Sequence, residues 1–332
     1  MRQKIAVIYN EPSQVRYSAM GEEKAVLGVL EEVSAVHQAL DESGYQVEEI
    51  PLSPPLDAVK EKLQSLKADI VFNLFEGFAG CPETEAAVAA MLPEVGLIYT
   101  GCPASALSLA LDKARTKTLL EKAGLATPRH QLLSPETIST FHLSVPCIVK
   151  PAGEDASHGL SEESVVDTLA SLEKQVAKIS RLFGGQALVE EYVDGREFNV
   201  TVFGSKKPVV LPVSEIVYTL PPALPKILTF AAKWEPESIY YQGSQAVCPA
   251  EVEEETRKRI AVAARKAFLL LGCSGYARVD FRLDTGGVPK IIEVNPNPDV
   301  SPDLGAARQA KAAGMPYNQF IEKIVLFARE RD

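Results

Sequence analysis

Short apolar runs alternate with amphipathic stretches over the first hundred residues. The stretch after the first run repeats apolar side chains at helical spacing, and Gly44 then ends it. The predicted elements, in order, are a strand at Lys4–Tyr9, a helix at Gly21–Leu40, a strand at Tyr45–Ile50, a helix at Leu56–Leu66 and a strand at Asp69–Leu74. This βαβαβ order predicts a doubly wound parallel sheet that binds ligands beyond the carboxyl ends of its strands. No G-x-G-x-x-G motif follows a strand, so a nicotinamide or flavin site is not supported.

The rest of the chain has a different order of predicted helices and strands. A helix near Glu83–Leu92 and a short strand at Leu97–Thr100 come first, and one long helix is predicted at Ala104–Ala123. Beyond it, strands become frequent and helices fewer. The predicted elements are strands at Arg129–Leu133, Val145–Lys150, Gln186–Tyr192, Glu197–Phe203 and Val209–Val213, helices at Ser164–Ser180, Glu253–Leu271 and Pro316–Arg329, and an irregular run at Thr219–Pro249. We therefore predict three domains, at residues 1–100, 101–190 and 191–332.

Two apolar runs, Tyr276–Leu283 and Val288–Val294, flank a turn that contains Gly-Gly, which predicts a β-hairpin. Side chains two residues apart share a face of a strand, so the polar residues of the two strands converge if their polar faces coincide. Hard oxygen ligands beside a guanidinium suit Mg²⁺ that carries nucleotide phosphates. The alternative is a half-exposed hairpin with solvated charges. The converging residues are Arg278, Asp280, Glu293 and Asn295.

Composition narrows the function classes. The 332 residues carry a net charge of −10, which argues against a general nucleic-acid binder. No apolar run approaches the roughly 20 residues that span a bilayer, so no membrane partner is expected. The five cysteines are scattered without a C-x-x-C pair, which indicates neither a disulfide framework nor a zinc site and favours the cytoplasm.

A loop of small residues, Ala152–Ser161, follows the predicted strand that ends at Lys150. Successive backbone N–H groups in such a loop can surround phosphate oxygens, which makes it a candidate flap. An ordinary hairpin turn explains the composition equally well.

Taken together, several segments resemble the ATP-grasp carboxylate–amine ligases, and among them the D-alanine–D-alanine ligases. The resemblance covers almost the whole chain in order. Its motifs are V-F-N-L-F-E-G at Val71–Gly77, Y-T-G at Tyr99–Gly101, A-L-D-K at Ala110–Lys113, C-I-V-K-P at Cys147–Pro151, L-V-E-E-Y-V-D-G-R-E at Leu188–Glu197, A-K-W at Ala232–Trp234, A-R-V-D at Ala277–Asp280 and I-I-E-V-N-P at Ile291–Pro296. The implied fold is ATP-grasp, an α/β (α+β) architecture in which a doubly wound parallel-sheet domain precedes two α+β domains that clasp ATP.

The resemblance implies an enzyme that makes an acyl phosphate from ATP and a carboxylate, which an amine then attacks, as in peptidoglycan precursor synthesis. Such chemistry needs positioned cations more than a nucleophilic side chain. The implied nucleotide-binding residues are Lys113, Lys150, Ser157, Glu190, Glu191, Tyr192, Val193, Glu197 and Lys233. The implied catalytic residues are Arg278, Lys233, Ser157 and Glu11, and Asp280, Glu293 and Asn295 would hold two Mg²⁺ ions, or Mn²⁺ in their place. A homodimer is also implied.

Departures from the family pattern concern the amino-acid substrates. Val15 stands where the family has a substrate-orienting Glu, a role that nearby Glu11 is placed to take. The family's loop His is absent from N-L-F-E-G, its flap Ser pair is Ala156 and Ser157 here, and its Tyr after the loop Lys is Trp234.

The stretch after E-x-N differs as well. Asp299 and Leu304 replace a Gly and a Ser that the family uses near the second substrate. A charge at residue 299 would repel a substrate carboxylate. The acceptor thus stays open between D-alanine and another amine. A phosphotransferase that releases the acyl phosphate and a non-catalytic nucleotide-binding relative are the remaining alternatives.

Overall fold

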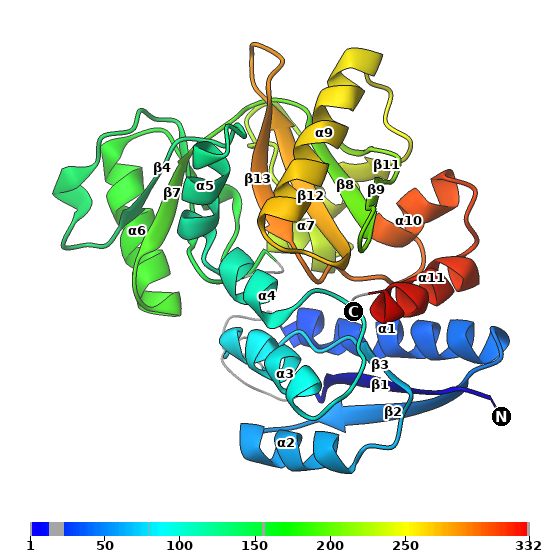
Figure 1. Cartoon of the computed structure of the whole chain (residues 1–332). Coiled ribbons are helices and arrows are strands. Elements are labelled where there is room, and N and C mark those ends of the chain that lie inside the picture. Colours follow the sequence, from blue (N-terminus) through cyan, green and yellow to red (C-terminus); the bar gives the residue numbers. More distant parts are fainter. Residues whose placement is uncertain (1, 13–22, 79, 155–156, 331–332) are drawn as a thin grey trace.

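The computed structural model describes residues 2–12, 23–78, 80–154 and 157–330. Figure 1 shows three β-sheets, each with its own helices. The first is a three-stranded sheet in the order β2-β1-β3, and both pairings are parallel, which confirms the predicted βαβαβ start. The expected strand at Leu97–Thr100 is reduced to one parallel bridge between Val71 and Tyr99. The elements are β1 (Lys4–Asn10), α1 (Glu23–Glu42), β2 (Gln46–Leu52), α2 (Leu56–Ser65), β3 (Ile70–Asn73) and α3 (Glu83–Glu94).

The helix predicted at Ala104–Ala123 is two helices, α4 (Ala104–Leu111) and α5 (Lys113–Lys122). Asp112 separates them because it leaves helical geometry, and its side chain accepts the N–H of Arg115 at 3.0 Å as an N-cap. The single-helix prediction was therefore wrong. The break places Lys113 at the first position of α5.

The second sheet is antiparallel, in the order β4-β7-β5-β6. Its strands are β4 (His130–Leu133), β5 (Cys147–Pro151), β6 (Val165–Val166) and β7 (Ala187–Glu191). Helix α6 (Leu169–Phe183) packs its apolar face on this sheet. The predicted helix start at Ser164 was five residues early, because Thr168 and Ser171 form the capping box that begins α6 and residues 165–166 are a strand.

The third sheet runs β11-β10-β8-β12-β13, with β9 beside β8. Its strands are β8 (Glu197–Gly204), β9 (Val209–Val210), β10 (Ser214–Tyr218), β11 (Ser244–Val247), β12 (Gly275–Leu283) and β13 (Pro289–Asn295), and α9 (Glu254–Leu270) packs on them. The predicted hairpin is confirmed as β12 and β13. The run predicted as irregular holds β11 and two short helices, α7 (Phe230–Trp234) and α8 (Ile239–Gln242).

The C-terminal helices α10 (Gly305–Ala312) and α11 (Tyr317–Arg329) return the chain to the first sheet, and Figure 1 shows α11 lying along α1. Their apolar side chains share one core with α1 and β1, which includes the fully buried Phe320 and Phe72. Residues 296–304, which follow β13, lie at this junction. No helix within the described ranges is long and apolar enough to cross a membrane.

Candidate active site

Strands β12 and β13 bring the predicted metal residues onto one face. In their antiparallel register Arg278 lies opposite Asn295, and Asp280 lies opposite Glu293. A bulge follows directly after Asp280 and shifts the register of the rest of the hairpin. The predicted convergence of the four side chains is thus confirmed, and their role as ligands stays a prediction.

Each of the two carboxylates is held by a cation. Arg278 binds Asp280 through two parallel hydrogen bonds, Nε to Oδ1 at 2.8 Å and Nη2 to Oδ2 at 2.9 Å. Lys113 Nζ binds Glu293 Oε1. Burial raises the pKa of Asp280 against the opposing charge of Arg278. Burial would also raise the pKa of Glu293, but Lys113 and Lys150 outweigh it and lower this pKa below its ordinary value.

The donor chemistry fits Mg²⁺ carried by a nucleotide. Among the residues that the structure describes, no three His, Cys, Asp or Glu side chains form a metal cluster. Asp280 and Glu293 supply two carboxylates, and Asn295 supplies an amide whose Oδ1 accepts the backbone N–H of Asn297 at 2.8 Å. Mg²⁺ is commonly held by one or two carboxylates with substrate phosphates completing its shell. The residues therefore suit a metal that arrives with phosphates.

A buried carboxylate joins two lysines beside this hairpin. Glu190 on β7 lies 3.0 Å from Lys150 Nζ on β5 and 3.1 Å from Lys117 Nζ on α5, both measured to Oε1. Burial would raise the pKa of Glu190, and the two ammonium groups outweigh it and lower this pKa. Lys117 was not predicted. Its position four residues after Lys113 in D-K-A-R-T-K, on the same helical face, was the available signal.

The predicted adenine and ribose residues extend from the end of β7 to the start of β8. Arg282 Nη1 donates to the carbonyl of Val193 at 3.0 Å, and Arg282 Nη2 binds Glu197. The hydroxyl of Tyr218 donates to Glu197 Oε2 at 2.7 Å. The predicted hinge and the predicted ribose acid are thus held together by Arg282 and Tyr218. From the sequence, Arg282 was expected only on the polar face of its strand, and Tyr218 had no predicted role.

The other two hinge residues are partly buried and already have partners. The backbone N–H of Tyr192 donates to the carbonyl of Pro146 at 3.1 Å. Glu191 pairs with Lys290 at 3.2 Å.

Helix α7 meets the flap on one side and α1 on the other. In the flap, Ser157 has a left-handed φ of 62°, and the buried ring of His158 stacks on Phe230 of α7 with centroids 5.7 Å apart. Burial and the charge of Arg278 lower the pKa of Lys233 on α7. Lys233 therefore lies close enough to Arg278 to belong to the same site. Trp234 lies against Gly28 of α1, where a Cβ would be 3.1 Å from its ring.

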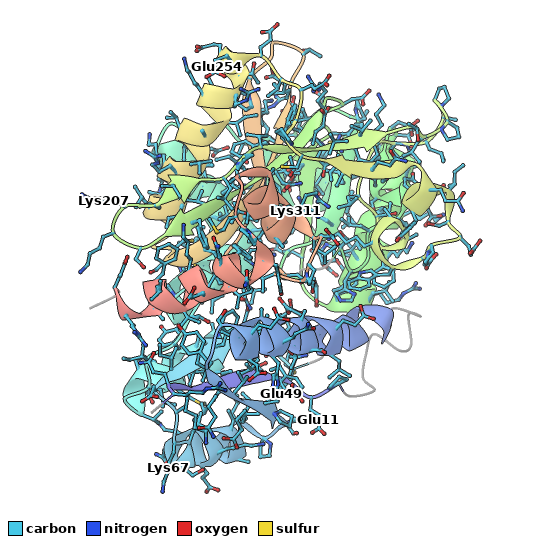
Figure 2. All side chains as sticks on the ribbon, turned by 90° about the vertical axis from the view of Figure 1, so that its right-hand side faces the viewer. Glu11, Glu49, Lys67, Lys207, Glu254 and Lys311 are labelled. Carbon is cyan, nitrogen blue, oxygen red and sulfur yellow. The ribbon has the colours of Figure 1, made fainter. Side chains whose placement is uncertain are left out.

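Glu11 does not join these residues. Its backbone N–H donates to Leu52, its carboxylate accepts from Ser53, and Figure 2 shows it at the surface near Glu49. Val15, for which Glu11 was the expected substitute, lies outside the described residues, as does Ala156.

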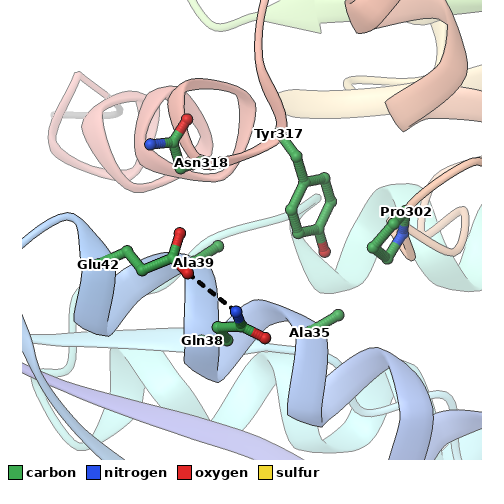
Figure 3. Close-up of a pocket in the computed structure, with 7 residues that line it drawn as sticks. All are labelled: Ala35, Gln38, Ala39, Glu42, Pro302, Tyr317 and Asn318. Atoms are coloured by element: carbon green, nitrogen blue, oxygen red, sulfur yellow. Dashed lines mark hydrogen bonds between the residues drawn. The ribbon is translucent and has the colours of Figure 1, made fainter.

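The two departures after β13 lie at the junction with α1. Asp299 caps its own turn, with Oδ1 accepting the N–H of Ser301 at 2.7 Å, and it faces the buried carboxyl of Glu32. Leu304 is 46% exposed. A surface pocket between α1 and α11 opens nearby, and Figure 3 shows the Tyr317 ring pointing into it beside Pro302.

Comparisons with known proteins bear on the whole chain. The family model described as "D-ala D-ala ligase C-terminus" matches residues 119–326. A D-alanine–D-alanine ligase of Gluconobacter oxydans is 31% identical over 299 residues, which cover 90% of this chain and 93% of the relative. This chain belongs to the D-alanine–D-alanine ligase family. Another relative, the uncharacterized protein y4sG of Sinorhizobium fredii, is 35% identical over 262 residues, or 79% of this chain and 75% of the relative.

The fold of the family is also matched. The D-alanine–D-alanine ligase of Bacillus anthracis, solved in complex with ATP, superposes with a TM-score of 0.73 at 21% identity and covers 99% of this chain and 98% of that structure. The predicted ATP-grasp fold is thereby confirmed.

Proposed function

We propose that this member of the D-alanine–D-alanine ligase family is an ATP- and Mg²⁺-dependent carboxylate–amine ligase. D-alanine is the first candidate for both substrates, and D-alanyl-D-alanine for peptidoglycan precursors is the corresponding product. The observation that carries the proposal is the pairing of β12 with β13, which sets Arg278, Asp280, Glu293 and Asn295 on one face beside Lys113. Family membership supports the ligase class independently.

The reaction has two steps that spread negative charge over oxygens. A substrate carboxylate oxygen attacks the γ-phosphorus of ATP and ADP leaves, and the amine then attacks the acyl carbon and phosphate leaves. Lys113 and Lys150 hold the phosphates, while Arg278 stabilises the oxygens of the acyl phosphate and of the tetrahedral species. Lys233, carried by α7, reaches the transferred phosphate. The flap around Ser157 closes over the site and keeps water from hydrolysing the acyl phosphate.

Metal binding uses the same hairpin. Asp280, Glu293 and Asn295 would hold two Mg²⁺ ions, with Mn²⁺ as a substitute, and phosphate oxygens would complete the coordination. When bound, the ions supply positive charge that neutralises the phosphates and aligns them for transfer.

The acceptor depends on a different part of the structure, and one observation there favours a second candidate. Asp299 faces the buried carboxyl of Glu32, where the resemblance implies a glycine near the second substrate. Two carboxyl groups there disfavour a substrate carboxylate and favour an amine that lacks one. An amine other than D-alanine is therefore the alternative acceptor.

An assay with a panel of candidate substrates distinguishes these candidate functions. Purified protein with ATP and Mg²⁺ is mixed with D-alanine, D-serine, L-alanine and simple amines, and ADP, phosphate and product mass are measured. Turnover with D-alanine alone supports the dipeptide assignment, whereas turnover only with another amine keeps the ligase and rejects the dipeptide. Hydroxamate formed with hydroxylamine, without any amide product, indicates a phosphotransferase.

A matched pair of variants tests the site itself. Glu293→Gln removes a proposed metal ligand, and Glu31→Gln changes an exposed carboxylate on α1. We expect the first to abolish Mg²⁺-dependent turnover and the second to leave it unchanged. Equal turnover of both variants would show that the measured activity does not arise at this hairpin, which rejects the proposed site and favours the non-catalytic nucleotide-binding alternative. We also propose a homodimer, which light scattering after size-exclusion chromatography tests directly.

A further inference from the structure

Lys117 is the most deeply buried cation of the nucleotide site. Its side chain is 3% exposed, against 14% for Lys150 and 9% for Lys113. Its ammonium group meets three acceptors, Glu190 Oε1 at 3.1 Å, Thr127 Oγ1 at 3.0 Å and the carbonyl of Ile292 at 3.2 Å. The contacts with Thr127 and Ile292 are hydrogen bonds and the contact with Glu190 is an ion pair, so the ammonium group of Lys117 is held by groups of the protein itself.

Lys150 contacts the same oxygen of Glu190 but is more exposed than Lys117, and its strand, β5, ends next to the flap. Under the proposed function Lys150 turns to the phosphates of ATP. Glu190 then keeps Lys117 as its cation, because the anchors at Thr127 and Ile292 hold Lys117 in place. A buried carboxylate without a cation would be costly, so this second lysine allows the first one to leave.

We infer that Lys117 is a positioning residue for the nucleotide base: it keeps Glu190 as an oriented carboxylate and so gives the site its preference for a 6-aminopurine. This inference rests on the proposed function and on the implied nucleotide-binding role of Glu190, whose carboxylate we place at the adenine. A carboxylate only accepts hydrogen bonds, so it binds the 6-amino group of ATP and rejects the 6-oxo group of ITP. Both lysines lie at Oε1, and Oε2 is therefore the oxygen that we expect the base to reach.

The charges in the cluster agree with this role. Burial lowers the pKa of Lys117 to about 8, against the opposing charge of Glu190, so the ammonium form prevails at neutral pH. Lys117 also bridges two sheets, because Glu190 belongs to β7 and Ile292 to β13. A purely structural role is thus the competing explanation, and the test must separate it from base selection.

The decisive measurement is the affinity for ATP and for ITP, each with Mg²⁺, by calorimetry at pH 7. For the wild type we expect ATP to bind more tightly than ITP. In Lys117→Met, neutral and of similar length, Glu190 loses its fixed cation and takes up a proton, which lets it donate to a 6-oxo group. We expect the ATP-to-ITP affinity ratio to fall by roughly 10- to 100-fold, the range for a hydrogen bond to a charged group.

Two further variants keep the test decisive. Lys113→Met, at a phosphate position, is expected to weaken both nucleotides alike and to leave the ratio unchanged. If Lys117→Met does not fold, Thr127→Val removes one anchor only and is expected to lower the ratio by a few-fold. Equal loss of ATP and ITP binding in the Lys117 or Thr127 variant, or a wild type that binds both equally, would overturn the inference. Because binding needs no acceptor, failure of every amine in the turnover panel would refute the ligase proposal without affecting this result.

Discussion

Glu32 gives a quantitative test of the electrostatics at the junction between α1 and the residues after β13. Its side chain is 3% exposed, and its Oε1 accepts the N–H of Val300 at 2.7 Å while the carboxyl faces Asp299. Burial, followed by the charges of Asp299 and Glu76, raises the pKa of Glu32 well above its ordinary value. Glu32→Gln keeps the size and the acceptor, and its amide can donate to Asp299 without a charge.

The sign and size of the effect follow from proton linkage. A carboxyl whose pKa is raised by folding contributes its full stability below the unfolded-state pKa and loses it as pH rises through the folded-state pKa. Each tenfold difference in proton affinity between the folded and unfolded states is worth about 1.4 kcal/mol. We therefore expect Glu32→Gln to be close to neutral near pH 4 and to raise the free energy of unfolding at pH 8.

Calorimetric melting of both proteins, without nucleotide, between pH 4 and 8.5 measures this difference. At pH 8 the expected gain appears as a higher Tm for Glu32→Gln than for the wild type. Glu31→Gln changes the adjacent, exposed carboxylate and should show no such trend. A Tm difference that does not change with pH, or a variant that melts below the wild type at pH 8, would show that Glu32 is not held as a destabilised buried acid.

Three further substitutions test other contacts. Gly195→Ala would place a Cβ 1.7 Å from the carbonyl oxygen of Leu283, so we expect a loss of about 2 kcal/mol or more in unfolding free energy, read as a lower Tm. Gly28→Ala should gain up to about 1 kcal/mol in helix propensity, but its Cβ would lie 3.1 Å from the ring of Trp234 on α7. We therefore expect a lower kcat, and an unchanged kcat would mean that α7 works independently of α1. Tyr218→Phe removes the hydroxyl that donates, at 2.7 Å, to Glu197, the carboxylate proposed to bind the ribose. We expect the KM for ATP to rise about fivefold, and an unchanged KM would count against that role of Glu197.

Local rules predicted the hairpin of this site but not its register. The period of two along a strand grouped Arg278 with Asp280 and Glu293 with Asn295, whereas the bulge after Asp280, which the pattern did not show, is what places Asp280 opposite Glu293. The break at Asp112 was missed because apolar periodicity continues through it, although an Asp before a Lys is a recognisable N-cap. Contacts between distant segments left no such trace in the pattern. Arg282 reaches Glu197 across 85 residues of chain, and only the pairing of β8 with β12 brings them together.

The ion pairs of the site also bear on how any single substitution there should be interpreted. Asp280 and Glu293, proposed to bind Mg²⁺, are held by Arg278 and Lys113, proposed to bind phosphate or acyl oxygens. Under the proposed function these pairs would separate on nucleotide binding, with Asp280 and Glu293 then holding Mg²⁺ and with Lys113 and Arg278 facing the phosphate and acyl oxygens. Charge stays balanced before and after, which keeps the desolvation cost of each step low. Removing one partner leaves the other charge uncompensated, so a loss of activity in Lys113→Met alone mixes lost phosphate binding with a disturbed Glu293. Double-mutant cycles across Lys113 and Glu293, with nucleotide affinity and Tm both measured, separate the two contributions.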